Sequence, residues 1–237
     1  MFEKKVILYL LLCATVLLGA GFPKLIHTGT DWESISFEMS GSMLDQETIE
    51  TQQGRFVRLS FPGSALSVEE GLPELPVFRR YVEIPFGAEP VVVIEDIQYA
   101  ETPVSFTVYP RQPARLKIEG YEPEFAYDSD FYLSDNYAFQ EPAMAYHAGI
   151  ARDYNLAIVE IHPVDFNPGT GTIRTITSLK FRIELPGADQ NETYTRKERL
   201  STSYWREVMD CRIENPGFFR PMYVPPTDIG FLVVGAS

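Results

Sequence analysis

The chain has 237 residues, of which 45% are hydrophobic and 13% aromatic, enough for the core of one large domain or two small ones. A charged fraction of 22% is ordinary and excludes bulk disorder. The formal net charge of −13 disfavours nucleic acid as a partner, because an acidic surface repels phosphate backbones.

Residues 1–21 have the pattern of a secretory signal peptide. A polar start with Lys4 and Lys5 precedes an apolar run over residues 6–18, and small residues at 19–21 supply a cleavage site. The run is short for a membrane span, so an uncleaved anchor is the weaker alternative and we expect no stable membrane anchor after signal removal. The exported part then has a net charge of −14 and one cysteine, Cys211, which excludes an intrachain disulfide. We therefore expect a secreted or cell-surface protein of a bacterium.

After a short leader at residues 24–30, segments that alternate apolar and polar residues follow one another. Alternation of this kind predicts half-buried strands, and clusters of Pro, Gly, Asp and Asn separate the segments. The expected strands are residues 32–39, 55–61, 78–84, 91–99, 104–109, 115–118, 155–161, 172–177 and 179–185. The last two are too close together for a parallel crossover, so we expect one bent strand or two strands that meet at a bulge near Ser178. The series predicts an all-β fold, an antiparallel sandwich or barrel.

Two segments near the C-terminus differ from this pattern. Residues 201–211 are the one good helix candidate, with an apolar stripe that includes Trp205 and Met209, and they follow a polar stretch with the composition of a linker. Residues 229–235 form an apolar run typical of a buried parallel strand. We expect this run to be the first strand of a following α/β domain.

Residues 121–146 form an aromatic and acidic segment that contains no Lys or Arg. It is long for a loop inside a compact domain, which favours a functional role. Its aromatic residues could anchor an interface or stack on sugars; the alternative is an acidic loop whose aromatic side chains pack on their own domain. The ring-bearing residues in question are Tyr127, Phe131, Tyr132, Tyr137 and Phe139.

The sequence predicts no catalytic residues, no metal site and no cofactor. The separation of His162 and Cys211 is similar to that of a caspase dyad, but His162 ends an alternating strand and Cys211 ends the predicted helix. Asp128 and Asp130 could bind calcium, but the remaining ligands and the turn glycine are missing, so a solvated acidic loop is the better interpretation.

Four motifs, in this order, resemble the propeptides of gingipain-type cysteine peptidases. They are Gly-Leu-Pro-Glu-Leu-Pro-Val at 71–77, Ile-Pro-Phe-Gly-Ala at 84–88, Tyr-Pro-Arg-Gln-Pro at 109–113 and the segment at 157–171 that contains Ile-His-Pro-Val-Asp-Phe-Asn-Pro-Gly. The resemblance covers about residues 30–186 and implies an antiparallel β-sandwich prodomain ahead of a caspase-like catalytic domain. The two prolines of the first motif fix φ and remove amide donors, so we interpret that motif as a rigid connection at a sheet edge.

The resemblance implies a domain order and a partner. We expect a signal peptide at 1–21, a β-sandwich propeptide domain at 22–186, a linker with a short helix at 187–226 and the start of a caspase-like catalytic domain at 227–237. The propeptide would help the catalytic domain of the same precursor to fold and would inhibit it until cleavage. In Arg-specific relatives a basic prodomain side chain is thought to fill the specificity pocket. Here either Arg152 does so, or the partner enzyme is not trypsin-like.

We predict an inhibitory contact by Phe131, Tyr132 and Arg152. Candidates for activation cleavage are the basic residues of the stretch expected to be exposed, namely Arg196, Lys197, Arg199, Arg212 and Arg220. The alternative function is a non-catalytic secreted module for adhesion or carbohydrate binding.

Overall fold

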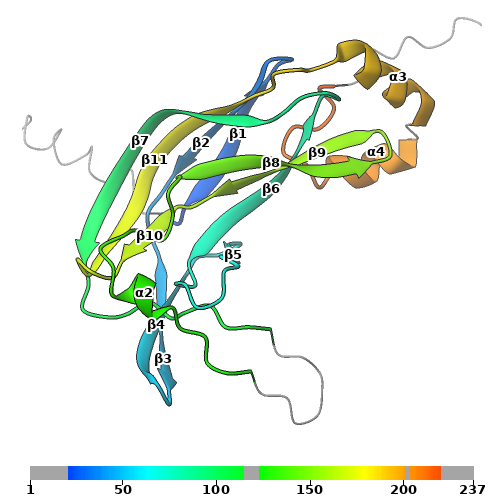
Figure 1. Cartoon of the computed structure of the whole chain (residues 1–237). Helices are drawn as coiled ribbons and strands as arrows, with labels where there is room; N and C mark the ends of the chain where they lie inside the picture. Colours follow the sequence, from blue (N-terminus) through cyan, green and yellow to red (C-terminus); the bar gives the residue numbers. More distant parts are fainter. Residues whose placement is uncertain (1–20, 115–122, 201–202, 220–237) are drawn as a thin grey trace, which may run out of the picture.

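The computed structural model describes residues 21–114, 123–200 and 203–219. Two antiparallel sheets pack against each other, with a hairpin at one end and two helices at the other (Figure 1). The predicted all-β sandwich with a short C-terminal helix is confirmed. The signal peptide, the expected strand at 115–118 and the final apolar run lie outside the described residues. Within the described part, no helix has both the length and the apolar character needed to cross a membrane.

The first sheet is built around one long strand, β11. On one edge β11 pairs with β2 and β10, on the other it pairs with β7, and β1 extends the sheet beyond β2. Register shifts against β7 at Ile176/Ser178 and Lys180/Phe181 bend β11, so the prediction of one bent strand is confirmed. The strand bounds are β1 Lys24–Thr30, β2 Ser34–Ser40, β7 Val91–Pro103, β10 Val164–Asn167 and β11 Thr172–Glu184.

The second sheet has the strand order β5-β6-β9-β8, so β8 lies at its edge. A separate hairpin of β3 and β4 extends from the end of the sandwich at which β10 lies (Figure 1). The bounds are β3 Asp45–Thr51, β4 Gly54–Ser60, β5 Ala65–Leu66, β6 Pro76–Ile84, β8 Ala143–Ala151 and β9 Tyr154–Ile161.

Alternation along the strands buries one face of each sheet in the main core. Phe37 of β2 lies opposite Phe181 of β11, and their rings stack with centroids 5.3 Å apart. A second core under the β4 and β10 end of the sandwich includes Leu59, Leu75 and Phe166. The burial of these side chains stabilises the sandwich, because it removes apolar surface from water on folding.

The motifs of the resemblance meet in space. Glu74 of the first motif is buried and pairs with Arg111 of the third at 2.9 Å, and with Arg58 of β4 at 2.9 Å. Backbone hydrogen bonds join the same two motifs, from Glu74 N to Tyr109 O and from Arg111 N to Leu72 O. The Pro-rich motif is thus a structural connection, as interpreted, and its Pro76 is the first residue of β6.

The turn after β6 explains the Ile-Pro-Phe-Gly motif. Gly87 has a φ of 80°, and a Cβ atom on it would lie 2.6 Å from the carbonyl oxygen of Gly187. Only glycine allows this approach of two backbones. The approach joins the β6–β7 turn to the segment that leads into the C-terminal helices.

Two helices follow the sandwich, α3 (Gln190–Leu200) and α4 (Ser203–Asp210). Helix α4 corresponds to the predicted helix, while α3 occupies the stretch expected as a linker. Among the side chains of α3 that the structure describes, Thr193 and Lys197 are buried, one helical turn apart, and both make polar contacts with the sandwich. Because no apolar stripe marks this face, the sequence pattern of α3 resembles that of a linker.

Several further segments differ from expectation, among them β3 and β10, which were not predicted. The expected leader forms β1, and the expected strand at 104–109 is an extended segment whose backbone joins β4 at an isolated bridge between Val57 and Val108. The aromatic and acidic segment contains the short helix α2 (Ser129–Tyr132) and ends in β8. The alternation of apolar and polar residues within a segment does not predict whether that segment pairs as a strand, because its partner strand lies far away in the sequence.

Candidate functional site

Phe131 and Tyr132, two residues of the predicted contact, lie on α2. Asp128 caps this helix by accepting a hydrogen bond from Phe131 N at 2.9 Å. Tyr132 is 8% exposed, donates its hydroxyl proton to Val108 O at 2.8 Å and stacks on Tyr127 with ring centroids 4.4 Å apart. Tyr132 therefore belongs to the second core, and Phe131 packs at the margin of that core. The alternative that the aromatic side chains pack on their own domain holds for Tyr132.

Arg152, the third predicted contact residue, lies in the turn between β8 and β9. It has a φ of 61°, unusual for a residue other than glycine, and its guanidinium group lies over the Trp205 ring of α4, 5.5 Å from the centroid. The nine residues of β8 separate this turn from the α2 end, a span of about 30 Å (Figure 1). The structure thus brings Phe131 and Tyr132 together but places Arg152 at the opposite end of the sheet.

Four of the rings considered for sugar stacking have one face covered by another side chain of this chain. Phe139 stacks on His162 with centroids 3.7 Å apart, and Arg174 lies over the Tyr137 ring at 3.9 Å. Tyr127 and Tyr132 stack on each other. These contacts make one face of each of the four rings unavailable to a sugar, whereas Phe131 meets Tyr132 edge-on.

A cavity of about 750 Å³ lies between the loop at 67–73, the segment at 138–146 and the outer side of β6 and β9. His162 lies at its base, with Nδ1 at 2.7 Å from Glu141 O and Nε2 at 3.1 Å from Glu160 Oε1. Glu160 also accepts a hydrogen bond from Arg79. Burial alone would raise the pKa of Glu160, but the hydrogen bonds from Arg79 and His162 outweigh it and hold the pKa below its usual range.

Asp165 fixes the rim of this cavity. Its Oδ1 accepts hydrogen bonds from the backbone N–H groups of Ala138 and Phe139, and its Oδ2 pairs with Arg174 at 3.1 Å. Burial raises the pKa of Asp165, although these donors and the N–H of Phe166 favour its charged form. The segment after α2 is therefore anchored to β10 and β11, not free.

His162 and Cys211 do not meet. His162 follows the last residue of β9, whereas Cys211 follows α4, whose Asp210 contacts Tyr154 at the first residue of β9. The eight residues of β9 separate the two side chains by about 25 Å. The two residues therefore cannot act as a thiolate–imidazole pair in this fold. Among the described residues, no group of His, Cys, Asp and Glu side chains could hold a metal ion.

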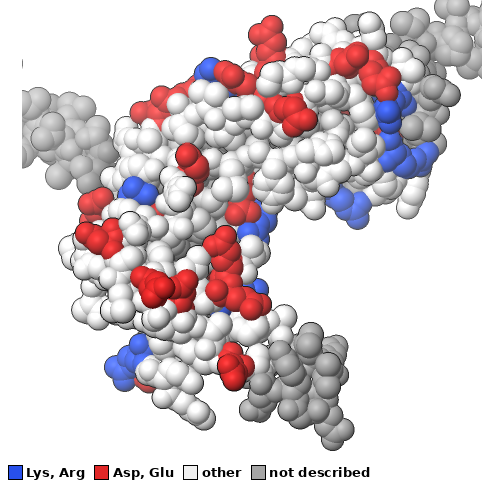
Figure 2. All heavy atoms as spheres, viewed as in Figure 1, with Lys and Arg blue, Asp and Glu red and all other residues white. Residues whose placement is uncertain are grey.

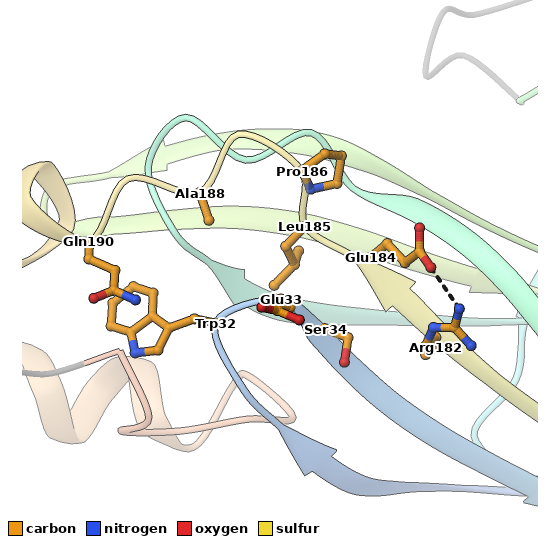
Figure 3. Close-up of a pocket in the computed structure, with 9 residues that line it drawn as sticks. All are labelled: Trp32, Glu33, Ser34, Arg182, Glu184, Leu185, Pro186, Ala188 and Gln190. Carbon is orange, nitrogen blue, oxygen red and sulfur yellow. Dashed lines mark hydrogen bonds and ion pairs between the residues drawn. The ribbon is translucent and has the colours of Figure 1, made fainter.

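A second depression of about 620 Å³ lies where β2, β11 and α3 meet. Figure 3 shows Arg182 and Glu184 directed toward each other, and Gln190 beside the Trp32 ring. The Arg182–Glu184 pair is solvent-exposed at 2.7 Å, and Trp32 packs edge-on against Phe219 with centroids 5.1 Å apart. This depression is the seam between sandwich and helices, and its exposed ion pair contributes little to stability.

The cleavage candidates differ in accessibility. Arg196 and Arg212 are accessible, Arg199 lies on α3 with its side chain outside the described residues, and Arg220 lies outside them altogether. Lys197 is 2% exposed, so the expectation that it lies on an exposed segment is wrong. Its ammonium group pairs with Glu83 of β6, lies 3.8 Å from Asp153 Oδ2 and sits 3.4 Å above the Tyr154 ring centroid.

The segment after α4 is also bound to the sandwich. Glu214 N donates to Tyr81 O at 2.9 Å, and the Asn215 side chain accepts from Glu83 N and donates to Glu83 O, each at 2.8 Å. Asn215 thus replaces a neighbouring strand at the open edge of β6. Sequence reasoning missed Glu83 and Asn215 and the buried position of Lys197, because single polar residues give no periodic signal.

Comparisons with known proteins agree with the motifs and the fold. The sequence model of the Propeptide_C25 family matches residues 28–204. Lys-gingipain HG66 of Porphyromonas gingivalis is 29% identical over 206 residues, covering 78% of this chain and 12% of that protein. Lys-gingipain of P. gingivalis strain ATCC 33277 is 28% identical with the same coverage. This chain therefore spans about an eighth of the length of these curated relatives.

Two solved structures have the same fold. One, described as structural insight into the zymogenic latency of gingipain K from P. gingivalis, has a TM-score of 0.61 at 23% identity and covers 71% of this chain and 95% of its own. The other is a complex of P. gingivalis RgpB pro- and mature domains, with a TM-score of 0.66 at 18% identity, covering 81% and 98%. With the family model matching most of the chain, the sequence-based resemblance is confirmed: this chain belongs to the Propeptide_C25 family, the propeptides of gingipain-type peptidases.

Proposed function

We propose that this chain is the prodomain of an exported gingipain-like cysteine endopeptidase and that its partner is the catalytic domain of the same precursor. It assists the folding of that domain and inhibits it until cleavage. The observation that supports this most is the family match over residues 28–204, which includes both sheets and α3. The similar fold of two gingipain prodomain structures adds to it.

The proposed organisation follows the sequence interpretation. Residues 1–21 are a signal peptide, residues 22–186 the sandwich, residues 187–226 the connection with its helices and residues 227–237 the start of the catalytic domain. Family membership and the bacterial relatives fit export from a bacterial cell. Release to the medium or retention at the cell surface are both compatible with this arrangement.

The inhibitory contact is proposed at the aromatic and acidic segment and at Arg152. Phe131 and Arg152 have accessible surface to offer a partner, whereas Tyr132 acts indirectly by holding α2 in place. Activation cleavage is proposed at one of the predicted basic residues, and of the described candidates Arg212 is exposed in a turn. The candidates are Arg196, Lys197, Arg199, Arg212 and Arg220. Cleavage after Lys197 would first require α3 to leave the sandwich.

The test uses the catalytic domain of the same precursor. That domain is refolded from denaturant with and without the purified chain, and the mature enzyme is then assayed with the chain added in trans. We expect a higher yield of active enzyme in the first experiment and inhibition in the second. An unchanged yield together with undiminished activity would show that the chain is not a prodomain of this enzyme.

A further inference from the structure

Both ring nitrogens of His162 face oxygen atoms that can only accept a hydrogen bond. Nδ1 lies 2.7 Å from the carbonyl oxygen of Glu141, and Nε2 lies 3.1 Å from Oε1 of Glu160. The carbonyl has no proton to give, and the lowered pKa of Glu160 keeps its carboxylate charged above the ordinary value of 4.5. A neutral imidazole has a single N–H, so it satisfies one of these contacts and leaves the other without a proton. Only the imidazolium ion, with a proton on each nitrogen, satisfies both.

The immediate contacts of the ring offset the cost of burying this charge. The His162 side chain is 2% exposed, and burial opposes the charged form. Against this, the Glu160 carboxylate faces Nε2, and the Phe139 ring lies flat on the imidazole with centroids 3.7 Å apart and an interplanar angle of 4°. The ring is therefore held between an anion, a carbonyl dipole and an aromatic face.

The wider surroundings of His162 are acidic. The charged side chains that line the two cavities beside it are Glu69, Arg79, Glu141, Glu160, Asp165 and Arg174. Arg79 of β6 pairs with Glu160 of β9, and Arg174 of β11 pairs with Asp165 of β10, which leaves the two exposed carboxylates on the rim in excess. The tyrosines that line these cavities, Tyr99 and Tyr146, are uncharged at neutral pH. Figure 2 shows that acidic side chains also predominate on the surface near α2, and this negative field favours a proton on His162.

His162 fastens the segment that leads from α2 to β8. Besides the bond from Nδ1 to Glu141 O, its backbone N–H donates to Pro142 O at 2.9 Å. The same segment stacks Phe139 on the ring and lines the cavity of about 750 Å³. When the ring gives up one proton, either the bond to Glu141 or the bond to Glu160 is lost, and residues 138–142 are held less firmly.

We propose that His162 is a proton-controlled latch, which holds residues 138–142 against the sandwich while its ring is charged and loosens them as pH rises. Histidine is the side chain whose charge changes between about pH 5 and 8. Because the charged ring has more partners in the folded chain, its contribution to stability is complete in mild acid and is lost as the ring releases its second proton. The Glu160 carboxylate is lost only in stronger acid, below 4.5. The latch is therefore closed in mild acid and opens toward alkaline pH.

The latch gives the domain a local response to pH that leaves its core intact. A segment that is held less firmly opens more often and becomes easier to cleave. An exported chain with this latch resists proteolysis at residues 138–142 in mildly acidic surroundings and loses that resistance in alkaline ones. This inference goes beyond the proposed function and does not depend on it.

The other two histidines provide a matched control. Nε2 of His27 lies 2.7 Å from the Thr30 hydroxyl, and Nε2 of His147 lies 2.6 Å from the side-chain oxygen of Asn155. A hydroxyl can donate or accept, and one N–H satisfies the amide oxygen, so a neutral ring fits both contacts.

The experiment follows the proton and the segment separately in the exported chain. NMR of chain labelled with ¹⁵N at histidine counts the protons on each ring as pH is raised from about 6 to about 9. Hydrogen exchange, corrected for the intrinsic effect of pH on exchange, measures opening of residues 138–142, with residues 156–159 of β9 as an internal reference. The variant His162→Gln removes the latch, and His27→Gln/His147→Gln is the control.

We expect two protons on the His162 ring at about pH 6 and one at about pH 9, with protection of residues 138–142 falling about tenfold or more between them. The double control should behave as wild type, and His162→Gln should show low protection that does not depend on pH. A wild-type ring with one proton at about pH 6, a ring that keeps both protons throughout, or protection that stays constant would overturn the proposal. So would a folded His162→Gln variant that keeps the pH dependence. The wild-type measurements decide the question even if that variant does not fold.

Discussion

At the scale of single residues, a side chain predicted to contact a partner can instead stabilise the fold, as Tyr132 does. Tyr132 has an aromatic ring in an acidic segment, yet its hydroxyl proton is given to Val108 O inside the second core. Burial raises the pKa of this phenol well above its usual value, because the charged form would be desolvated. An inhibition assay of a Tyr132 variant therefore reports on folding as well as on contact.

Two substitutions at Tyr132 separate these effects. Tyr132→Phe removes only the hydrogen bond to Val108 and leaves the ring, so we expect a loss of about 1 kcal/mol in the free energy of unfolding. Tyr132→Ala also leaves a cavity in the second core, and we expect a loss of about 3–5 kcal/mol. Urea unfolding followed by tyrosine and tryptophan fluorescence measures both. Equal and small losses for the two variants would show that Tyr132 is not part of the core.

Glu160 gives the domain a dependence on acid. Its folded-state pKa lies below the ordinary value of 4.5, so its contribution to stability is complete above that value and is lost as pH falls through the folded-state pKa. We expect Glu160→Gln to destabilise by about 2 kcal/mol at pH 7, because Arg79 and His162 lose a charged partner. The difference from wild type should shrink as pH falls below 4.5. A difference that stays constant from pH 7 to pH 3, measured by urea unfolding, contradicts this assignment.

At the scale of elements, the predictable strands are those whose own residues alternate. The strands β2, β4, β6 and β9 lie within one or two residues of their predicted bounds, because Ile35, Phe37 and their equivalents mark one face directly in the sequence. The strands β1 and β3 were missed, since most of their residues are exposed and their positions depend on pairing with β2 and β4. For the candidate site, the sequence suggests Phe131 and Arg152 as contact residues but not the apolar row of Tyr81, Ile158 and Tyr146 on the outward face of the second sheet. The apolar residues Leu156 and Ile158 on the outward face of β9 were the available signal, because apolar residues on both faces indicate a strand covered on both sides.

Helix α3 is held to the sandwich by charge, and this makes its stability testable. Lys197→Met should cost about 3–5 kcal/mol, since it removes the ammonium group that pairs with the buried carboxylate of Glu83 and lies 3.8 Å from Asp153 Oδ2. Neutralising all three residues, with Lys197→Met, Glu83→Gln and Asp153→Asn, should recover most of that loss. Urea unfolding of the single and triple variants measures the difference. If the triple variant is less stable than the single variant, the loss of stability in the single variant does not come from buried negative charge.

At the scale of the whole molecule, the two helices and the segment after them close one end of the sandwich as a unit. Lys197 joins α3 to β6, Asn215 joins the segment after α4 to the same strand, and Phe219 packs on Trp32, just before β2. Tyr154 of β9, Met209 of α4 and Ile213 form a small core between these ties. The region that carries the proposed cleavage residues is therefore folded onto the domain that it would release.

This arrangement predicts that cleavage is limited by opening of the unit and not by the exposure of a side chain. Asn215→Ala removes two hydrogen bonds to the backbone of Glu83, and we expect trypsin to cleave after Arg212 about tenfold faster or more, because opening costs less free energy. If α3, α4 and the following segment open together, the same variant also accelerates cleavage after Arg196, and Lys197→Met accelerates cleavage after Arg212.

Limited trypsin digestion followed by mass spectrometry measures each rate. Arg55, exposed in the β3–β4 hairpin, is an internal reference whose cleavage should not change. Acceleration confined to the bond nearest each substitution would show that the anchors act separately, and equal rates in all variants would place the limiting step elsewhere.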